Sequence, residues 1–260
     1  MKVCLAGYCG WTVIDHYLPF IEDKSIYTLQ SFFDYKSMSE KKHREIELFI
    51  KKSSLFILDS GAFSFFGNNN TEVDWDSYIS NYCDFINKHK IKNFIELDID
   101  NLVGIKEVER IREVITQKTG LKPIPVWRPS RGLKYWDYMI KNFSFVAISA
   151  SGKYDSSWTR GKDGEVAIKK LTRLAAENNC KVHGLGYTSI TKMKYTGFYS
   201  VDSTAWLSSQ KFGGAIKLFN PNQGNFKTIK KQNGLRLKQS VRAHQFNEWI
   251  KFQKYANNKI

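Results

Sequence analysis

Four aspartates stand where apolar, strand-like runs of this sequence end, and their positions suggest chemistry. They are Asp59, Asp98, Asp100 and Asp202. Two carboxylates that face one site can act as nucleophile and as general acid or base, which is the arrangement used for substitution at the anomeric carbon of a sugar. A helix cap or a turn explains any single one of these aspartates equally well. The four together exceed what capping requires, so the sequence predicts a site built on carboxylates.

Glycines and a histidine lie close to these acids in the sequence. Gly61, Gly184 and Gly186 have no Cβ, so their backbone amides could approach a flat heterocycle closely. Tight turns explain the same glycines equally well. His183 is a candidate contact to ribose or phosphate, and a structural histidine with satisfied hydrogen bonds is the alternative.

Cationic and aromatic residues at other strand ends suggest contact with a nucleic acid. Arg128 and Arg131 lie in one strand-end loop, where they are predicted to hold a phosphate or, equally, to be solvated at the surface. Phe63, Trp127 and Trp206 are candidates for stacking on an extruded base. Most other aromatic residues are expected in the core.

The elements that must position these residues alternate between strands and helices up to about Trp206. Short runs rich in β-branched and aromatic residues predict eight strands, at Lys2–Gly7, Ser25–Phe32, Ser54–Asp59, Asn93–Ile99, Pro123–Trp127, Phe145–Ser149, Lys181–Gly186 and Phe198–Ser203. Helical periodicity predicts helices at Ser39–Lys52, Asp76–Lys90, Lys106–Thr119, Gly132–Lys141, Glu165–Asn178 and Ser240–Tyr255.

This alternation predicts an α/β fold, a (β/α)8 TIM barrel in a single domain with a terminal helix. A doubly wound open sheet is the alternative, since it shows the same alternation. The sequence after the first strand lacks the glycine spacing of a dinucleotide-binding loop. We therefore prefer the barrel, with residues 1–210 as the catalytic domain and residues 211–260 as an extension packed on it.

The extension carries most of the net charge. The chain has 40 Lys and Arg against 25 Asp and Glu, a formal charge of +15. Eleven of the bases and one acid, Glu248, lie in residues 211–260, so +10 of the +15 belongs there. Such a segment suggests a polyanionic partner, with a merely soluble Lys-rich surface as the alternative. Lys231, Arg236, Lys238 and Arg242 are the predicted nucleic-acid contacts.

Other features exclude several classes of protein. No stretch approaches the roughly 20 apolar residues of a membrane helix. Four cysteines without a C-x-x-C pair favour a reducing cytoplasm over a disulfide framework and argue against a cysteine zinc site. We expect no metal, no membrane partner and a cytoplasmic location.

The motifs at the strand ends resemble those of the queuine/archaeosine tRNA-guanine transglycosylase superfamily. Asp59–Ser64 resembles its D-S-G-G-F-Q motif, and Leu97–Asp100 resembles its F-D-E-C segment. His183–Thr188 is similar to its G-V-G-T-P segment, and Tyr199–Ser203 to its F-D-C strand. The four matches occur in the family's order, between about Leu55 and Trp206.

The resemblance implies a role for each matching residue and a TIM-barrel fold. It makes Asp202 the nucleophile on C1′ and Asp59 the general acid/base for the leaving and incoming purine. Asp98 would bind the guanine-like edge of the base, and Asp100 takes the position of the family's cysteine. The remaining base-binding residues that it implies are Ser60, Gly61, Phe63, His183, Gly184 and Gly186. This chemistry needs no cofactor.

The departures from the family bear on the polymer. The tRNA enzymes carry a C-x-C-x-x-C…H zinc cluster, whereas no cysteine follows Cys180 here. A shorter, zinc-free branch, notably in bacteriophages, inserts 7-deazaguanines such as preQ0 into DNA, and the chain resembles this branch better. We therefore expect a DNA-guanine transglycosylase that takes a free 7-deazaguanine, acting in the host cytoplasm if phage-encoded. The alternatives are tRNA as substrate, a retaining glycoside hydrolase, or a non-catalytic nucleic-acid-binding subunit.

Overall fold

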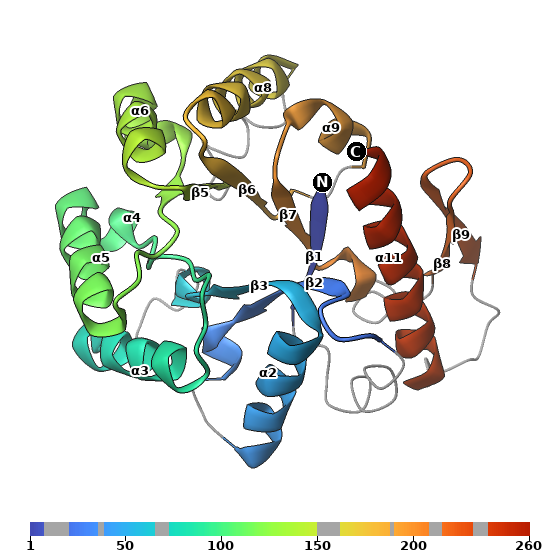
Figure 1. Cartoon of the computed structure of the whole chain (residues 1–260), viewed down its shortest axis with the longest axis horizontal. Helices are drawn as coiled ribbons and strands as arrows, with labels where there is room; N and C mark the ends of the chain where they lie inside the picture. The colour runs from blue at the N-terminus through green and yellow to red at the C-terminus, as the bar shows by residue number, and fades with distance from the viewer. Residues whose placement is uncertain are drawn as a thin grey trace.

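The protein has an α/β fold built on one curled, parallel β-sheet. The computed structural model describes residues 1–7, 21–35, 39–65, 73–149, 162–187, 190–207, 215–230 and 239–260. Seven parallel strands form the main sheet in the order β3-β2-β1-β7-β6-β5-β4. Figure 1 shows the strands at the centre of the molecule and the helices around the outside.

The described helices and strands follow one another along the chain as alternating units. The strands are β1 (Lys2–Ala6), β2 (Ile26–Ser31), β3 (Ser53–Asp59), β4 (Val126–Trp127), β5 (Phe145–Ser149), β6 (Lys181–Leu185), β7 (Ser200–Ser203), β8 (Ala215–Asn220) and β9 (Asn225–Lys230). The α-helices are α2 (Glu40–Lys52), α3 (Trp75–Lys88), α4 (Asp100–Val103), α5 (Ile105–Thr119), α6 (Gly132–Asn142), α8 (Lys162–Glu177), α9 (Ile190–Thr196) and α11 (Gln239–Lys259). The short 3-10 helices are η2 (Phe32–Asp34), η3 (Ala62–Phe65), η4 (Pro129–Arg131) and η5 (Ala205–Leu207).

The two outermost strands of the sheet, β3 and β4, are linked through a short extended segment. Leu58 and Phe94 form a parallel bridge, and Ile95 and Ile124 form another. Ile95 N donates to the Leu58 carbonyl (2.8 Å), and Ile124 N donates to the Phe94 carbonyl (2.7 Å). This arrangement is TIM-barrel-like. The doubly wound alternative does not fit, because β7 returns to pair with β1 and the remaining strands follow in sequence order.

Apolar side chains cover both faces of the sheet. One buried cluster, which includes Cys4, Leu29, Ile57 and Ala147, lies on the inner face. A larger cluster, which includes Ile46, lies between the strands and the helices around them. Strands buried on both faces are expected to be almost wholly apolar, and this is why the strand runs are readable in the sequence.

The helices begin where capping residues stand. Ser39 Oγ accepts a hydrogen bond from Lys42 N at the start of α2, and the Asp74 side chain accepts from Ser77 N at the start of α3. These side chains satisfy N–H groups that have no partner within the helix. The six helices predicted from periodicity are confirmed, with ends displaced by at most four residues.

The segment after Trp206 contains a β-hairpin that the sequence interpretation missed. β8 and β9 pair antiparallel, with Phe219 opposite Phe226, and form a separate two-stranded sheet. The hairpin packs on α11, where Phe219 N donates to Glu248 Oε2 (2.7 Å) and Gln245 Nε2 donates to the Lys217 carbonyl (2.9 Å). In Figure 1 the hairpin lies on the outer side of α11.

Helix α11 packs on the amino-terminal strands. Gln253 Nε2 donates to the carbonyls of Val3 (2.7 Å) and Tyr27 (2.6 Å), and Trp206 packs edge-on against Phe246. No helix in the described part of the chain combines the length and apolar character needed to cross a membrane.

Candidate active site

Three of the four predicted aspartates interact with one another at the carboxyl ends of the strands. Asp59 is the last residue of β3, Asp98 follows the bridging segment, and Asp202 lies in β7. Burial, together with the negative charges of Asp98 and Asp202, raises the pKa of Asp59 to about 7, although a backbone hydrogen bond from Gly61 opposes this increase. We refer to Asp59, Asp98 and Asp202 as the carboxylate cluster.

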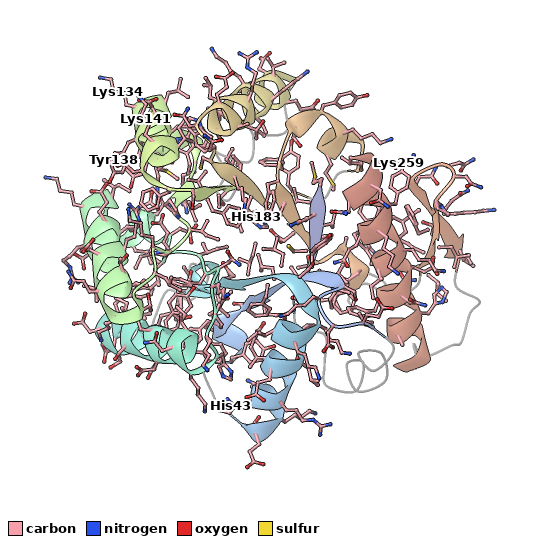
Figure 2. The ribbon with its side chains drawn as sticks, viewed as in Figure 1. His43, Lys134, Tyr138, Lys141, His183 and Lys259 are labelled. Carbon is pink, nitrogen blue, oxygen red and sulfur yellow. The ribbon has the colours of Figure 1, made fainter. Side chains whose placement is uncertain are left out.

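The Asp202 side chain is held by donors from β6 and from the residue that follows it. Its Oδ1 accepts a hydrogen bond from Gly186 N (2.6 Å) and lies 3.3 Å from His183 Nε2. His183 Nδ1 lies 2.8 Å from Ser200 Oγ. The consistent assignment places the imidazole proton on Nε2, so that His183 donates to Asp202 and accepts from Ser200. Figure 2 shows His183 near the centre of the ring of strands, and its side chain is fully buried.

Asp59 is fixed by the turn that follows β3. Gly61 N donates to Asp59 Oδ2 (3.1 Å), and Tyr78 from α3 donates to the Ser60 carbonyl (2.6 Å). Ser60 Oγ is buried and has no hydrogen-bond partner in the described part of the chain. A buried hydroxyl without a partner is uncommon, and a ligand that supplied one would gain from it.

Asp98 is paired with a buried arginine. Arg128 Nη2 donates to Asp98 Oδ2 (2.5 Å) and to the Asp98 carbonyl (3.1 Å). Burial and the like charge of Glu96 raise the pKa of Asp98 to about 6. The positive charge of Arg128 offsets only part of this increase. The Arg128 side chain is almost wholly buried, so a phosphate contact from it would require this pair to separate.

Asp100 lies in a second ion pair, with Arg131. Arg131 Nη2 and Nε donate to the two carboxylate oxygens of Asp100 (2.9 and 3.1 Å), while its Nη1 donates to Glu96 Oε1 (2.8 Å). Burial opposes ionisation, but the Arg131 hydrogen bonds and charge lower the pKa of Asp100 below its ordinary value. Arg131, like Arg128, is therefore engaged with carboxylates in this structure and not with solvent. Asp100 is predicted to be a structural anion that orients Arg131.

Glu96 is the central acceptor of this network, and the sequence interpretation missed it. It is fully buried and also accepts from Arg112 Nε (2.7 Å) and from Val126 N (2.8 Å). The sequence did contain a signal for this role, because Glu96 lies within the apolar run from Phe94 to Leu97. An acid in a buried run requires charged or hydrogen-bonding partners. Arg112, from α5, gave no signal of its own.

The three glycines near the acids differ in what they accommodate. A Cβ on Gly61 would lie 2.5 Å from the Phe33 Cβ, and one on Gly184 would lie 2.9 Å from the Phe198 ring. These two glycines therefore serve close packing within the protein. Gly186 has a φ of +67° and nothing within 4 Å of its Cβ position, so open space lies beside the amide that binds Asp202.

Two tryptophans proposed for base stacking belong to the core instead. Trp127 Nε1 donates to the Gly132 carbonyl (2.8 Å), and Trp206 Nε1 donates to the Ala6 carbonyl (2.8 Å). Both side chains are buried. That expectation is corrected, because neither ring presents a face to a ligand.

Several predicted contacts lie outside what the structure describes. Lys231, Arg236 and Lys238 fall in residues 231–238, and the side chains of Phe63 and Arg242 are also outside the description. Among the described residues, no group of three or more His, Cys, Asp or Glu side chains is placed to hold a metal ion.

Comparisons with known proteins assign no family. No protein-family model and no curated protein matches the chain. Among solved structures, the chain is similar to the carboxyl transferase domain of Rhizobium etli pyruvate carboxylase with 3-bromopyruvate, at a TM-score of 0.44 and 14% identity. The match covers 98% of this chain and 48% of the other, so this chain spans about half the length of that structure. A likeness of this extent carries no inference about activity.

The site therefore combines, at one end of the strands, a carboxyl group with a raised pKa, Asp59, and a carboxylate held by hydrogen-bond donors, Asp202. Asp59 has a pKa near neutrality, so it can both give and accept a proton at physiological pH. Asp202 is oriented by an imidazole and a backbone amide, as a nucleophilic carboxylate requires. Asp98, which follows the bridging segment, adds an acceptor that its arginine partner holds in place.

Proposed function

We propose that the protein is a DNA-guanine transglycosylase, which exchanges guanine in DNA for a 7-deazaguanine such as preQ0. The observation that carries the proposal is the carboxylate cluster, in which one acid titrates near pH 7 beside a second carboxylate anchored by two donors. The motif resemblance supplies the substrate class, and the basic extension favours a polyanionic polymer.

The reaction proceeds in two displacements at C1′ of the target nucleotide. An oxygen of Asp202 attacks C1′ as the bond from C1′ to the guanine breaks, and protonated Asp59 gives its proton to the leaving base. The incoming 7-deazaguanine then gives its ring N–H proton to the Asp59 carboxylate and attacks C1′, which releases Asp202. The two inversions give overall retention, and Asp59 ends the cycle protonated.

Asp98 is the proposed acceptor for the donor edge of the base. Arg128 fixes the position of its carboxylate, and Ser60 Oγ is a nearby buried hydroxyl without a partner in the described residues. The open space beside Gly186 is where a flat heterocycle would meet the backbone. The target nucleotide must leave the stack before it can enter, at a cost of a few kcal/mol.

We also propose that the sheet is a complete (β/α)8 barrel, with the segment around Phe94 and Ile95 as its eighth strand. The two parallel bridges of this segment support the proposal. Residues 1–210 would then form the catalytic domain, and residues 211–260 a DNA-docking extension packed on it. The hydrogen bonds from α11 to Val3 and Tyr27 support this packing.

A label-transfer assay tests the proposal. The full-length protein is incubated with radiolabelled guanine or preQ0 and with separate pools of DNA and tRNA, and label is measured in each polymer. We expect label in DNA. Label that enters only tRNA overturns the choice of polymer, and release of free sugar with water as the acceptor indicates a hydrolase.

Substitution of the two reacting acids separates their roles. Asp202→Asn should abolish both label transfer and the covalent protein–DNA adduct, because the amide is a poor nucleophile. Asp59→Asn should reduce transfer by at least about 100-fold, the usual scale of general acid–base catalysis, and can still allow an adduct to be trapped. Asp84→Asn, an exposed aspartate on α3, is the matched control. An adduct in the Asp202→Asn protein would remove the nucleophile assignment.

A further inference from the structure

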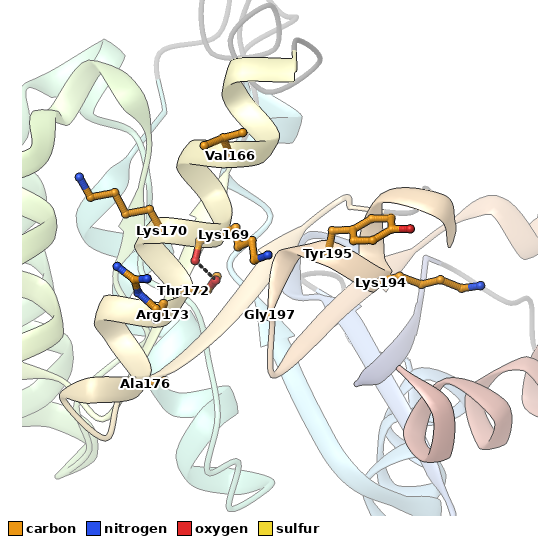
Figure 3. A pocket seen from close by; sticks show the side chains of 9 residues that line it. All are labelled: Val166, Lys169, Lys170, Thr172, Arg173, Ala176, Lys194, Tyr195 and Gly197. Carbon is orange, nitrogen blue, oxygen red and sulfur yellow. Dashed lines mark hydrogen bonds between the residues drawn. The ribbon is translucent and has the colours of Figure 1, made fainter.

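A groove between helices α8 and α9 carries only positive charge and lies outside the candidate active site. Its volume is about 610 Å³. Figure 3 shows the nine residues that line it, of which four are Lys or Arg and none is acidic. We call it the cationic groove and define it by its polar and aromatic residues, which are Lys169, Lys170, Thr172, Arg173, Lys194 and Tyr195.

Most of this charge is not neutralised within the protein. Arg173 lies 3.6 Å from Glu177, in an exposed pair of the kind that contributes little. Lys169, Lys170 and Lys194 are exposed and form no ion pair with any residue that the structure describes. Like charges gathered in a hollow raise the local potential and attract an anion. The groove is therefore complementary to a negatively charged partner.

Helices α8 and α9 are in direct contact at the floor of the groove. Thr172 Oγ1 donates to the Thr196 carbonyl (2.5 Å), which ties α8 to the end of α9. Gly197 follows with a φ of +68°, and a Cβ there would lie 2.9 Å from Thr172 Oγ1. This contact holds the end of α9 against α8, the two helices that carry the cations.

The groove runs along α8 on the outside of the sheet. Because the strands are parallel and α8 leads back to the start of β6, Val166 near the start of α8 lies toward the carboxyl ends of the strands, where the candidate active site stands. Gly197, just before β7, lies at the opposite end of the groove. The Val166 end is therefore the one that a DNA strand leaving the site would meet first.

We propose that the cationic groove binds the phosphate backbone of DNA that flanks the target nucleotide. This inference rests on the proposed function, because it names a docking surface for the same substrate. Tyr195 is 65% exposed at the edge of the groove and offers an aromatic face to an unstacked base. A protein partner fits less well, because lysine is depleted in protein–protein interfaces.

Removal of the unpaired charges tests the proposal. The triple variant Lys169→Gln, Lys170→Gln, Lys194→Gln is compared with a control triple, Lys92→Gln, Lys106→Gln, Lys134→Gln, whose lysines are exposed elsewhere. Dissociation constants for a 30-bp duplex are measured by fluorescence anisotropy between 50 and 200 mM salt. We expect the groove variant to bind at least about tenfold more weakly near 100 mM salt, and its salt slope to fall by about two to three, since each phosphate contact contributes about 0.9.

The control triple should change affinity by less than about twofold, as expected for charges that do not touch the phosphates. Equal weakening in the two triples overturns the groove as a docking surface. Concentration-dependent self-association that only the groove variant loses, measured by sedimentation, also overturns it and assigns the groove to a second copy of the chain.

The same proteins distinguish this inference from the proposed function. The groove variant should keep the label-transfer rate of the wild type at saturating DNA and raise only the DNA concentration needed for half-maximal rate. Wild-type protein that binds no DNA at all contradicts the proposed substrate. DNA binding and base exchange that are both unaffected by the groove substitutions contradict only the groove.

Discussion

Among single residues, Asp59 has the property on which most of the proposed chemistry depends. Burial and two neighbouring carboxylates raise its pKa to about 7, whereas an unfolded chain would ionise it near 3.8. The folded state therefore binds a proton that the unfolded state has lost between about pH 4 and 7. Stability contributed by this group is present below pH 4 and is lost as the pH rises through 7.

Asp59→Asn should abolish this loss, because the amide stays neutral and can still accept from Gly61 N. Relative to wild type, the variant's free energy of unfolding should rise between pH 4 and 8, by up to about 4 kcal/mol for three pKa units. Denaturant unfolding at several pH values measures it. Asp84→Asn should show no such pH-dependent difference. A constant offset between wild type and Asp59→Asn across this range would contradict the raised pKa.

The sequence predicted which acids stand at strand ends, because an apolar run that stops at an aspartate is visible in one dimension. It did not predict what each acid would contact. Arg128 and Arg131 lie in a loop and were interpreted as phosphate ligands, whereas the fold buries both against carboxylates. Such pairing depends on which strands lie side by side, and this is known only once the fold is known.

Among the elements, helix α11 is held to the sheet by a buried amide as well as by other hydrogen bonds and apolar packing. Gln253 Nε2 donates to the carbonyls of Val3 and Tyr27, so it joins the last helix to the first two strands. Gln253→Ala leaves both buried carbonyls without this donor and should lower the free energy of unfolding by about 1–3 kcal/mol. Chemical denaturation measures the loss.

The neighbouring exposed residue provides the matched control for this prediction. Lys254→Ala should change stability by no more than about 0.5 kcal/mol. Equal effects of the two substitutions would mean that the amide bonds do not anchor the helix.

The elements also show where a sequence pattern is sufficient and where it fails. Helices with Ser or Asp caps and six of the eight predicted strands were placed within about two residues. The strand predicted at Pro123–Trp127 is only Val126–Trp127, and the one predicted at Asn93–Ile99 forms only two isolated bridges. The β8–β9 hairpin was missed because its loop has four residues, more than a two-residue hairpin turn, and because its strands show no regular alternation of apolar and polar residues. Its partner is α11, which lies later in the chain, so only the tertiary contacts reveal it.

For the whole molecule, the distribution of charge is uneven, and the proposed function would use it to separate catalysis from docking. Residues 1–210 carry 29 bases and 24 acids, whereas residues 211–260 carry eleven bases and one acid. The carboxylate cluster would repel a polyanion that approached it alone. Cations placed away from the cluster can hold the DNA backbone and offset this repulsion without lowering the pKa of Asp59, because charges separated by more than about 10 Å are largely screened in salt.

The basic extension should therefore act on DNA affinity and leave the chemical step unchanged. The quadruple variant Lys231→Gln, Arg236→Gln, Lys238→Gln, Arg242→Gln should lower the salt slope of DNA binding by up to about 3.6, at about 0.9 per phosphate contact. Label transfer at saturating DNA should match wild type. A fall in that saturated rate would place these cations at the reacting nucleotide instead. If the extension and the cationic groove bind different phosphates, the losses of binding free energy in the quadruple and groove variants should add in a protein that carries all seven substitutions. If they share phosphates, the loss in that protein should be smaller than the sum.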